Sequence, residues 1–129
     1  MIYDRGDVVL LPFPCTDQSG SKKRPAIILS TAQNNSRRSD IVVAPITSNV
    51  LGSRQDDTKL LDWGTAGLLK PSVVKGILGT VEQSLVIRML GKATENDLFK
   101  VNTTIAYFLG LVTFAPHAAS ATPPESSSD

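Results

Sequence analysis

Short runs of β-branched and other aliphatic residues, each ended by proline, glycine, serine or asparagine, constrain the possible folds of this sequence most strongly. Three runs open the chain, GDVVLLPFP, RPAIILS and DIVVAPITS, and they predict strands near 7–12, 24–30 and 40–47. Three more, TKLLDW, PSVVKGILGTV and LVIRMLGK, predict strands within 58–63, 71–81 and 85–92. Six short strands within about ninety residues favour a small β-barrel.

One helix is predicted near the C-terminal end of the sequence. Thr94 in TEND supplies a hydroxyl N-cap three residues before an acidic side chain, and Gly110 is suited to end the helix. Apolar residues recur every three or four positions and form one stripe for core or dimer contacts: Leu98, Val101, Ile105, Phe108 and Val112. The sequence after Phe114 has few bulky apolar residues. We therefore expect one folded domain over 1–114 and a disordered tail over 115–129.

The number and positions of cysteine and histidine limit the kinds of site that the chain can form. Cys15 is the only cysteine of the 129 residues, which excludes an internal disulfide and fits a reducing cytoplasm. The only histidine, His117, falls in the predicted tail, so we interpret Cys15 as structural and expect no metal site. No glycine-rich nucleotide motif occurs, and we expect no cofactor. No apolar run approaches the roughly 20 residues that cross a bilayer, so we expect no membrane contact.

Charged residues are distributed unevenly along the chain, although the formal net charge is only +1. The acidic residues Asp56, Asp57, Glu95 and Asp97 lie in a polar loop or at the start of the helix, where solvation and capping are the expected roles. By contrast, the segment from 18 to 39 holds five basic residues and no acidic one. Such a segment is either an ordinary solvated face or a binding surface for a polyanion.

Arginine, lysine and hydroxyl side chains suit RNA cleavage by the substrate's own 2′-hydroxyl, because the protein need only align that group and stabilise a phosphorane. Arg24 precedes Pro25, which favours an extended backbone at the start of a strand. Thr47 and Ser48 lie at the end of DIVVAPITS, where a hydroxyl can meet a phosphate. Spacing alone leaves Arg24 and Thr47 as ordinary strand-end residues.

Four motifs occur in order between residues 5 and 111: Arg-Gly-Asp-Val, Gly-Ser-x-x-Arg-Pro, Pro-Ile-Thr-Ser, and Leu-Gly-Lys before the terminal helix. Together they resemble the MazF/PemK family of type II toxin–antitoxin toxins. The resemblance implies a mainly β fold with a C-terminal helix, the SH3-like β-barrel of the MazF/CcdB/Kid type, paired as a homodimer. It also implies a metal-independent endoribonuclease, or mRNA interferase, that cuts single-stranded RNA to 2′,3′-cyclic phosphate and 5′-hydroxyl ends and is inhibited by a cognate antitoxin.

The resemblance also transfers functional residues. The arginine of the Arg-Pro motif falls on Arg24 and the threonine of the Ile-Thr motif on Thr47, which are the catalytic candidates. RNA-binding candidates are Ser21, Lys22, Lys23, Ser48 and Lys75. Some members carry a histidine in the first loop and Arg-x-Asp near the fifth strand, whereas this chain has no histidine there and reads Lys75-Gly76-Ile77. The general acid and base are therefore left open.

Two other functions share this fold. A gyrase-binding toxin would act through the C-terminal helix and would not need the Arg-Pro and Ile-Thr pair. An inactive relic would bind RNA or antitoxin without cutting. An acidic, partly disordered antitoxin segment could occupy a basic RNA groove.

Trp63 could stack on a base, but a single tryptophan in a small domain favours the core or an interface.

Overall fold

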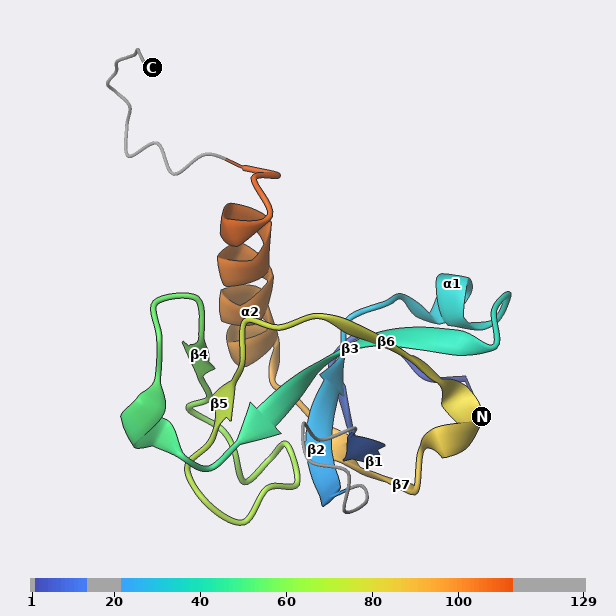
Figure 1. The fold of residues 1–129 in the computed structure, drawn as a ribbon, viewed down its shortest axis with the longest axis horizontal. Coiled ribbons are helices and arrows are strands. Elements are labelled where there is room, and N and C mark those ends of the chain that lie inside the picture. The colour runs from blue at the N-terminus through green and yellow to red at the C-terminus, as the bar shows by residue number, and fades with distance from the viewer. Residues whose placement is uncertain (1, 14–21, 113–129) are drawn as a thin grey trace.

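The computed structural model describes residues 2–13 and 22–112, and within them the expected mainly β fold with a C-terminal helix is confirmed (Figure 1). The strands are β1 (Asp7–Phe13), β2 (Lys22–Ile28), β3 (Asp40–Thr47), β4 (Thr58–Lys59), β5 (Val73–Val74), β6 (Gly79–Glu82) and β7 (Arg88–Lys92). The helices are α1 (Ala32–Asn35) and α2 (Glu95–Phe108), with 3₁₀ turns η1 (Val50–Gly52) and η2 (Gln83–Leu85). Cys15, Ser21, His117 and the predicted tail over 115–129 lie outside the described residues.

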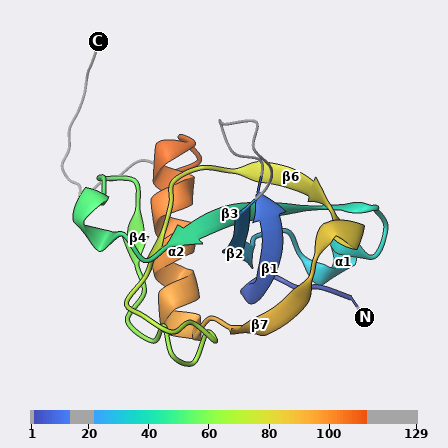
Figure 2. The same cartoon turned by 60° about the horizontal axis from the view of Figure 1, so that its bottom comes forward.

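All of the pairs between the seven strands are antiparallel, and β3 lies at the centre of the sheet. The sheet order is β4-β5-β3-β2-β1-β7, and β6 also pairs with β3. One edge of β3 pairs with β2. Its other edge pairs with β6 over 40–43 and with β5 over 46–47. The result is a strongly curved half-barrel (Figure 2).

Both faces of the central strands are covered, which explains why β1, β2 and β3 read as nearly continuous apolar runs. Side chains alternate between faces along a strand, and the core accordingly forms two clusters. The helix-side cluster includes Val8, Ile27, Ala44, Ile46 and Val101. The opposite cluster comprises Val9, Leu11, Ala26, Ile28, Ile41 and Val43. Burying alternate residues on two sides fixes the register, because a slip of one residue would exchange the two sets.

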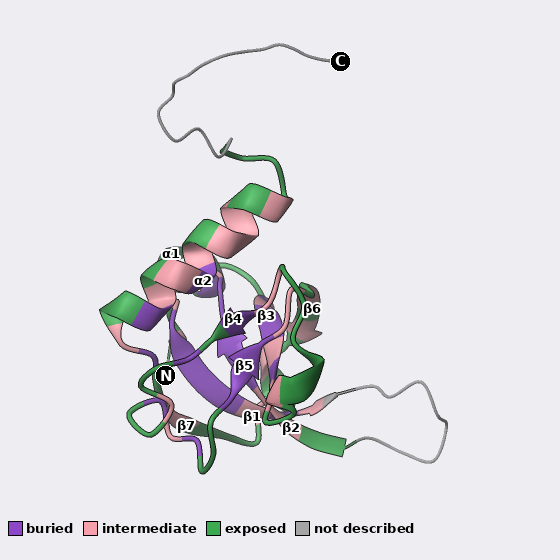
Figure 3. Cartoon of the chain, turned by 90° about the vertical axis from the view of Figure 1, so that its left-hand side faces the viewer, coloured by how far each residue is buried: buried purple, intermediate pink, exposed green. Residues whose placement is uncertain are grey.

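Helix α2 packs over the helix-side cluster as its stripe predicts. The Thr94 hydroxyl accepts a hydrogen bond from the Asp97 amide at 3.2 Å, as expected of an N-cap. Val101 is fully buried, and the outer surface of the helix is exposed (Figure 3). Gly110, with a φ of +75°, ends the helix in the left-handed conformation. The stripe does not extend to Val112, which is 52% exposed beyond the helix end.

The predicted role of Asp97 and the predicted strand over 58–63 are both corrected. Asp97 is fully buried and accepts hydrogen bonds from the amides of Leu61 (3.0 Å) and Asp62 (2.8 Å). The carboxylate therefore holds residues 61–62 in a loop after β4, which ends at Lys59. Trp63 is half-buried and packs against the helix-side cluster, which confirms its core role.

The observed bounds of other elements also differ from the predicted ones. The predicted 24–30 strand begins and ends two residues earlier, and the 85–92 strand is reduced to 88–92, after η2. The predicted 71–81 strand divides into β5 and β6 because Gly76 leaves the β3 edge: its amide donates to Asp57 instead. The polar stretch 31–39 contains α1, whose N-cap is Thr31. Within the described residues, no helix has the length and apolar character that a membrane span requires.

We expect Asp97→Ala to lower the free energy of unfolding by about 3 kcal/mol, because two buried amide donors would lose a charged acceptor. Urea denaturation followed by circular dichroism measures the change. Glu95→Ala is the matched control, since Glu95 lies in the same first turn but is exposed, and it should cost less than about 1 kcal/mol. Equal losses in the two variants would contradict this account of the buried carboxylate.

Candidate functional site

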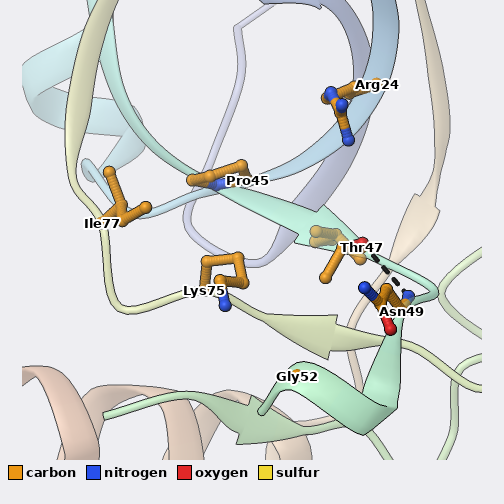
Figure 4. A pocket seen from close by; sticks show the side chains of 8 residues that line it. Arg24, Pro45, Thr47, Asn49, Gly52, Lys75 and Ile77 are labelled. Atoms are coloured by element: carbon orange, nitrogen blue, oxygen red, sulfur yellow. Dashed lines mark hydrogen bonds between the residues drawn. The ribbon is translucent and has the colours of Figure 1, made fainter. Parts of the chain in front are cut away.

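Arg24 and Thr47 lie together at one end of the sheet, as the sequence predicts. In the β2–β3 register, Ala26 is opposite Pro45, and continuing that antiparallel register by two residues places Arg24 opposite Thr47. Side chains of directly opposed residues extend from the same face. Both residues line a cavity of about 440 Å³. The Arg24 guanidinium extends toward the strand end that carries Thr47 (Figure 4).

The Thr47 hydroxyl is oriented by the turn that follows β3. Its oxygen accepts a hydrogen bond from the Asn49 amide at 3.1 Å, drawn as the dashed line in Figure 4. Because that lone pair is occupied, the hydroxyl proton is available for a donor interaction within the cavity. Asn49 and Gly52 also line this cavity. Their sequence context does not single them out, since an asparagine after a strand is an ordinary turn residue.

Lys75 enters the same cavity, and a buried ion pair holds it there. Its backbone amide donates to Pro45 O at 2.8 Å, which keeps the segment after β5 against β3. Its ammonium group lies 2.8 Å from the Asp57 carboxylate, whose side chain is 2% exposed. Asp57 also accepts hydrogen bonds from the amides of Arg54 (2.8 Å) and Gly76 (2.9 Å). The prediction that Asp57 is a solvated loop residue is therefore wrong.

The protonation of Asp57 follows from these contacts. Burial by itself raises the pKa of the carboxyl group, but the Lys75 ammonium and the two amides outweigh it, so the pKa lies below its ordinary value. The carboxylate stays ionised and saturated with donors. It positions Lys75 and cannot readily serve as a free base in the cavity.

A second, larger cavity shares Arg24 and Thr47 with the first. It measures about 720 Å³ and also holds the predicted RNA contacts Lys22, Lys23 and Ser48. Lys22 and Lys23 are exposed on β2. Lys75 lines only the first cavity, and the predicted contact Ser21 lies outside the described residues. Four of the five predicted RNA-binding residues thus border one of two adjoining cavities.

Neither cavity offers a metal-binding set. The described residues that line them include arginines, lysines, hydroxyls and an asparagine but no carboxylate, imidazole or thiol. Within 2–13 and 22–112, no group of three or more histidine, cysteine, aspartate or glutamate side chains is arranged to hold a metal ion. The chemistry of this part of the chain is that of an anion-binding site with a hydroxyl group beside it.

Comparison of the sequence with protein families gives one match that covers most of the chain. Residues 4–109 match the family described as PemK-like, MazF-like toxin of type II toxin-antitoxin system. The chain belongs to this family of toxins. Comparison with curated protein sequences gave no match.

Solved structures of MazF toxins share the fold. A MazE–MazF structure from Deinococcus radiodurans superimposes with a TM-score of 0.71 at 23% identity, covering 87% of this chain and 99% of that one. An endoribonuclease in complex with its cognate antitoxin from a mycobacterial species gives 0.65 at 21% identity, with 84% and 94% covered. A Mycobacterium tuberculosis MazF toxin gives 0.64 at 22% identity, with 78% and 92% covered. The expected MazF fold is thereby confirmed.

In this PemK/MazF toxin domain, Asp57→Asn should reduce stability near neutral pH, because a buried ion pair loses its charge while keeping its shape. A carboxyl group with a depressed pKa stabilises the folded state above its unfolded pKa of about 4, and that contribution disappears as the pH falls through the lower folded pKa. The difference between wild type and variant should therefore shrink on acidification. Urea unfolding from neutral to acidic pH measures it.

Asp56→Asn is the matched control for that series. Asp56 is the neighbouring residue and forms no ion pair with another described residue, so its substitution should change stability near neutral pH by less than about 0.5 kcal/mol. A pH-independent loss in Asp57→Asn, or a loss as large in Asp56→Asn, would show that the Lys75 ion pair is not the source of the effect.

Proposed function

We propose that this chain is the toxin of a type II toxin–antitoxin system and a metal-independent endoribonuclease that cuts single-stranded RNA, with messenger RNA as its target. Family membership supports the toxin class. The observation that carries the chemistry is the convergence of Arg24, Thr47 and Lys75 on one cavity whose described lining residues include no carboxylate. These groups suit a substrate that brings its own nucleophile.

In the proposed reaction, the ribose 2′-oxygen attacks the adjacent phosphorus and the bond from phosphorus to the 5′-oxygen breaks. The products carry a 2′,3′-cyclic phosphate and a 5′-hydroxyl. The Arg24 guanidinium donates two parallel hydrogen bonds to the non-bridging oxygens and stabilises the charge that builds up in the phosphorane. The Thr47 hydroxyl donates a hydrogen bond to the same phosphate or orients the 2′-hydroxyl.

Proton transfer in this proposal uses solvent and the cationic groups. The 2′-hydroxyl proton passes to water, because none of the described residues that line the cavity is a carboxylate and Asp57 is saturated by Lys75 and two amides. The leaving 5′-oxygen takes a proton from water or from Lys75. This arrangement makes stabilisation of the phosphorane, rather than a strong base, the main source of rate.

The same proposal includes the partners and the assembly. A cognate antitoxin would inhibit the toxin by placing an acidic segment in the cationic cavities, as a competitor of RNA. A homodimer is supported by large apolar side chains left exposed on the described surface, among them Leu51 at 96%, Leu111 at 72% and Phe99 at 69%. The proposed site of action is the cytoplasm, where messenger RNA is found.

Purified protein should cut a mixed-sequence single-stranded RNA in the presence of EDTA, and Arg24→Ala should lower the cleavage rate by about 10²–10³-fold through loss of a transition-state donor. Arg24→Lys should also be impaired, because an ammonium cannot reproduce the bidentate contact. Gel analysis of end-labelled RNA with end-group mapping measures both. Arg37→Ala is the control, since Arg37 is exposed and lines neither cavity. Inhibition by EDTA, or full activity in Arg24→Ala, would refute this mechanism.

Thr47→Val should reduce kcat by about 10-fold or more with little change in stability, because it keeps the β-branched shape and removes only the hydroxyl. Thr47→Ser should retain most activity. Single-turnover cleavage at saturating RNA separates kcat from KM. Comparable rates for Thr47→Val and wild type would remove the hydroxyl from the mechanism.

A further inference from the structure

The second cavity gathers far more positive charge than one reacting phosphate requires. Among the described residues, its lining includes five basic side chains, Lys22, Lys23, Arg24, Lys70 and Arg88, and no acidic one. Within the described part of the chain, none of these five pairs with a carboxylate. Like charges held together raise the free energy of the folded state unless an anion joins them. The cavity is therefore suited to an extended polyanion.

Two of these cations come from segments that the RNA-binding prediction did not include. Arg88 begins β7 and is opposite Leu10 in the β1–β7 register, while the next β1 residue, Leu11, is opposite Arg24. Arg88 thus lies across β1 from the Arg24 end of β2. Lys70 belongs to the loop between β4 and β5, and this loop contributes a continuous lining stretch from Gly67 to Lys70. Strands and a loop distant in sequence converge on one groove.

The two cavities differ in their positive charge, which makes the site asymmetric about Arg24 and Thr47. Both contain Arg24 and Thr47, so the pair lies where they adjoin. The first cavity adds one cation, Lys75, which is neutralised by Asp57. The second adds four cations, none of which pairs with a described carboxylate. A chain of phosphates passing Arg24 is therefore attracted much more strongly on one side than on the other.

Apolar surface accompanies the cations in the second cavity. Leu10, Leu68, Leu69 and Leu90 all contribute to its lining, and Leu69 is 93% exposed. Single-stranded nucleic acid binds best where a charged groove follows the backbone and apolar surface receives the bases. The combination matches single-stranded RNA better than a bare phosphate ion.

We propose that Lys70 and Arg88, with Lys22 and Lys23, form a phosphate track that holds the RNA on one side of the phosphate being cut. This inference rests on the proposed ribonuclease function. It adds two RNA-binding residues and stronger binding of the RNA on one side of the site. Lys70 and Arg88 supply affinity and do not contact the reacting phosphate. Their removal should thus weaken binding without slowing the chemical step.

The test compares the full-length double variant Lys70→Gln/Arg88→Gln with Arg37→Gln/Lys59→Gln. The control removes the same charge from two exposed residues that line neither cavity. The probe is a fluorescein-labelled oligouridine of about 20 nucleotides, and its anisotropy is followed over a range of KCl concentrations. Losing two phosphate contacts should reduce the slope of log affinity against log salt by about 1.4, and the control should keep the wild-type slope. Arg88→Lys should also keep it, because the charge remains.

Cleavage provides the second measurement. The track double variant should raise KM and leave kcat at saturating RNA unchanged, whereas a variant with a disturbed fold would lose kcat as well. The binding assay does not require cutting, so it still tests the track if the chain fails to cleave RNA. Equal salt slopes for the two double variants would overturn the inference. So would a binding loss confined to an acidic peptide such as oligoglutamate, because the groove would then be a peptide site.

Discussion

The candidate site depends on the use of both edges of β3. Pairing with β2 brings Arg24 beside Thr47, and pairing with the β5 segment brings Lys75 to the opposite side. The backbone hydrogen bond from Lys75 to Pro45 extends that second pairing by one residue. Because the two core clusters fix the β3 register from both faces, a slip that would separate these residues would also expose a buried face. The same burial that stabilises the sheet therefore preorganises the cavity.

Buried and exposed charged residues have different roles: buried carboxylates stabilise loops, and exposed basic residues line the candidate site. Buried carboxylates are saturated: Asp97 receives two amides and the Lys100 ammonium, and Asp57 receives two amides and the Lys75 ammonium. The cations that pair with no described carboxylate, in contrast, line accessible cavities. Leaving a buried carboxylate without donors would cost several kcal/mol, whereas an exposed lysine costs little. Acidic residues thus build the loops that frame the site, and basic residues remain available to an anionic partner.

Local patterns predicted the long elements well and the short ones poorly. The β3 range and the Thr94 cap were predicted because a β-branched run bounded by turn residues and a capping box are both encoded in adjacent residues. The division of 71–81 into two strands was missed, because it depends on Asp57 capturing the Gly76 amide from 19 residues away in the chain. The convergence of Arg24 and Thr47 came from a resemblance of motifs. Lys70 and Arg88 gave no signal, since isolated cations in sequence do not reveal a shared groove.

The unpaired charge of the groove also links binding to stability. Any polyanion that occupies the groove in the folded state alone stabilises that state by RT ln(1 + [L]/Kd), and it removes repulsion that the free toxin must sustain. RNA and an acidic antitoxin segment would draw on this same energy, so they must compete. A competitor that also covers the exposed leucine of the groove, Leu69, would gain apolar burial as well. A peptide inhibitor in the groove would thus have a way to bind more tightly than RNA without closer contacts to the reacting groups.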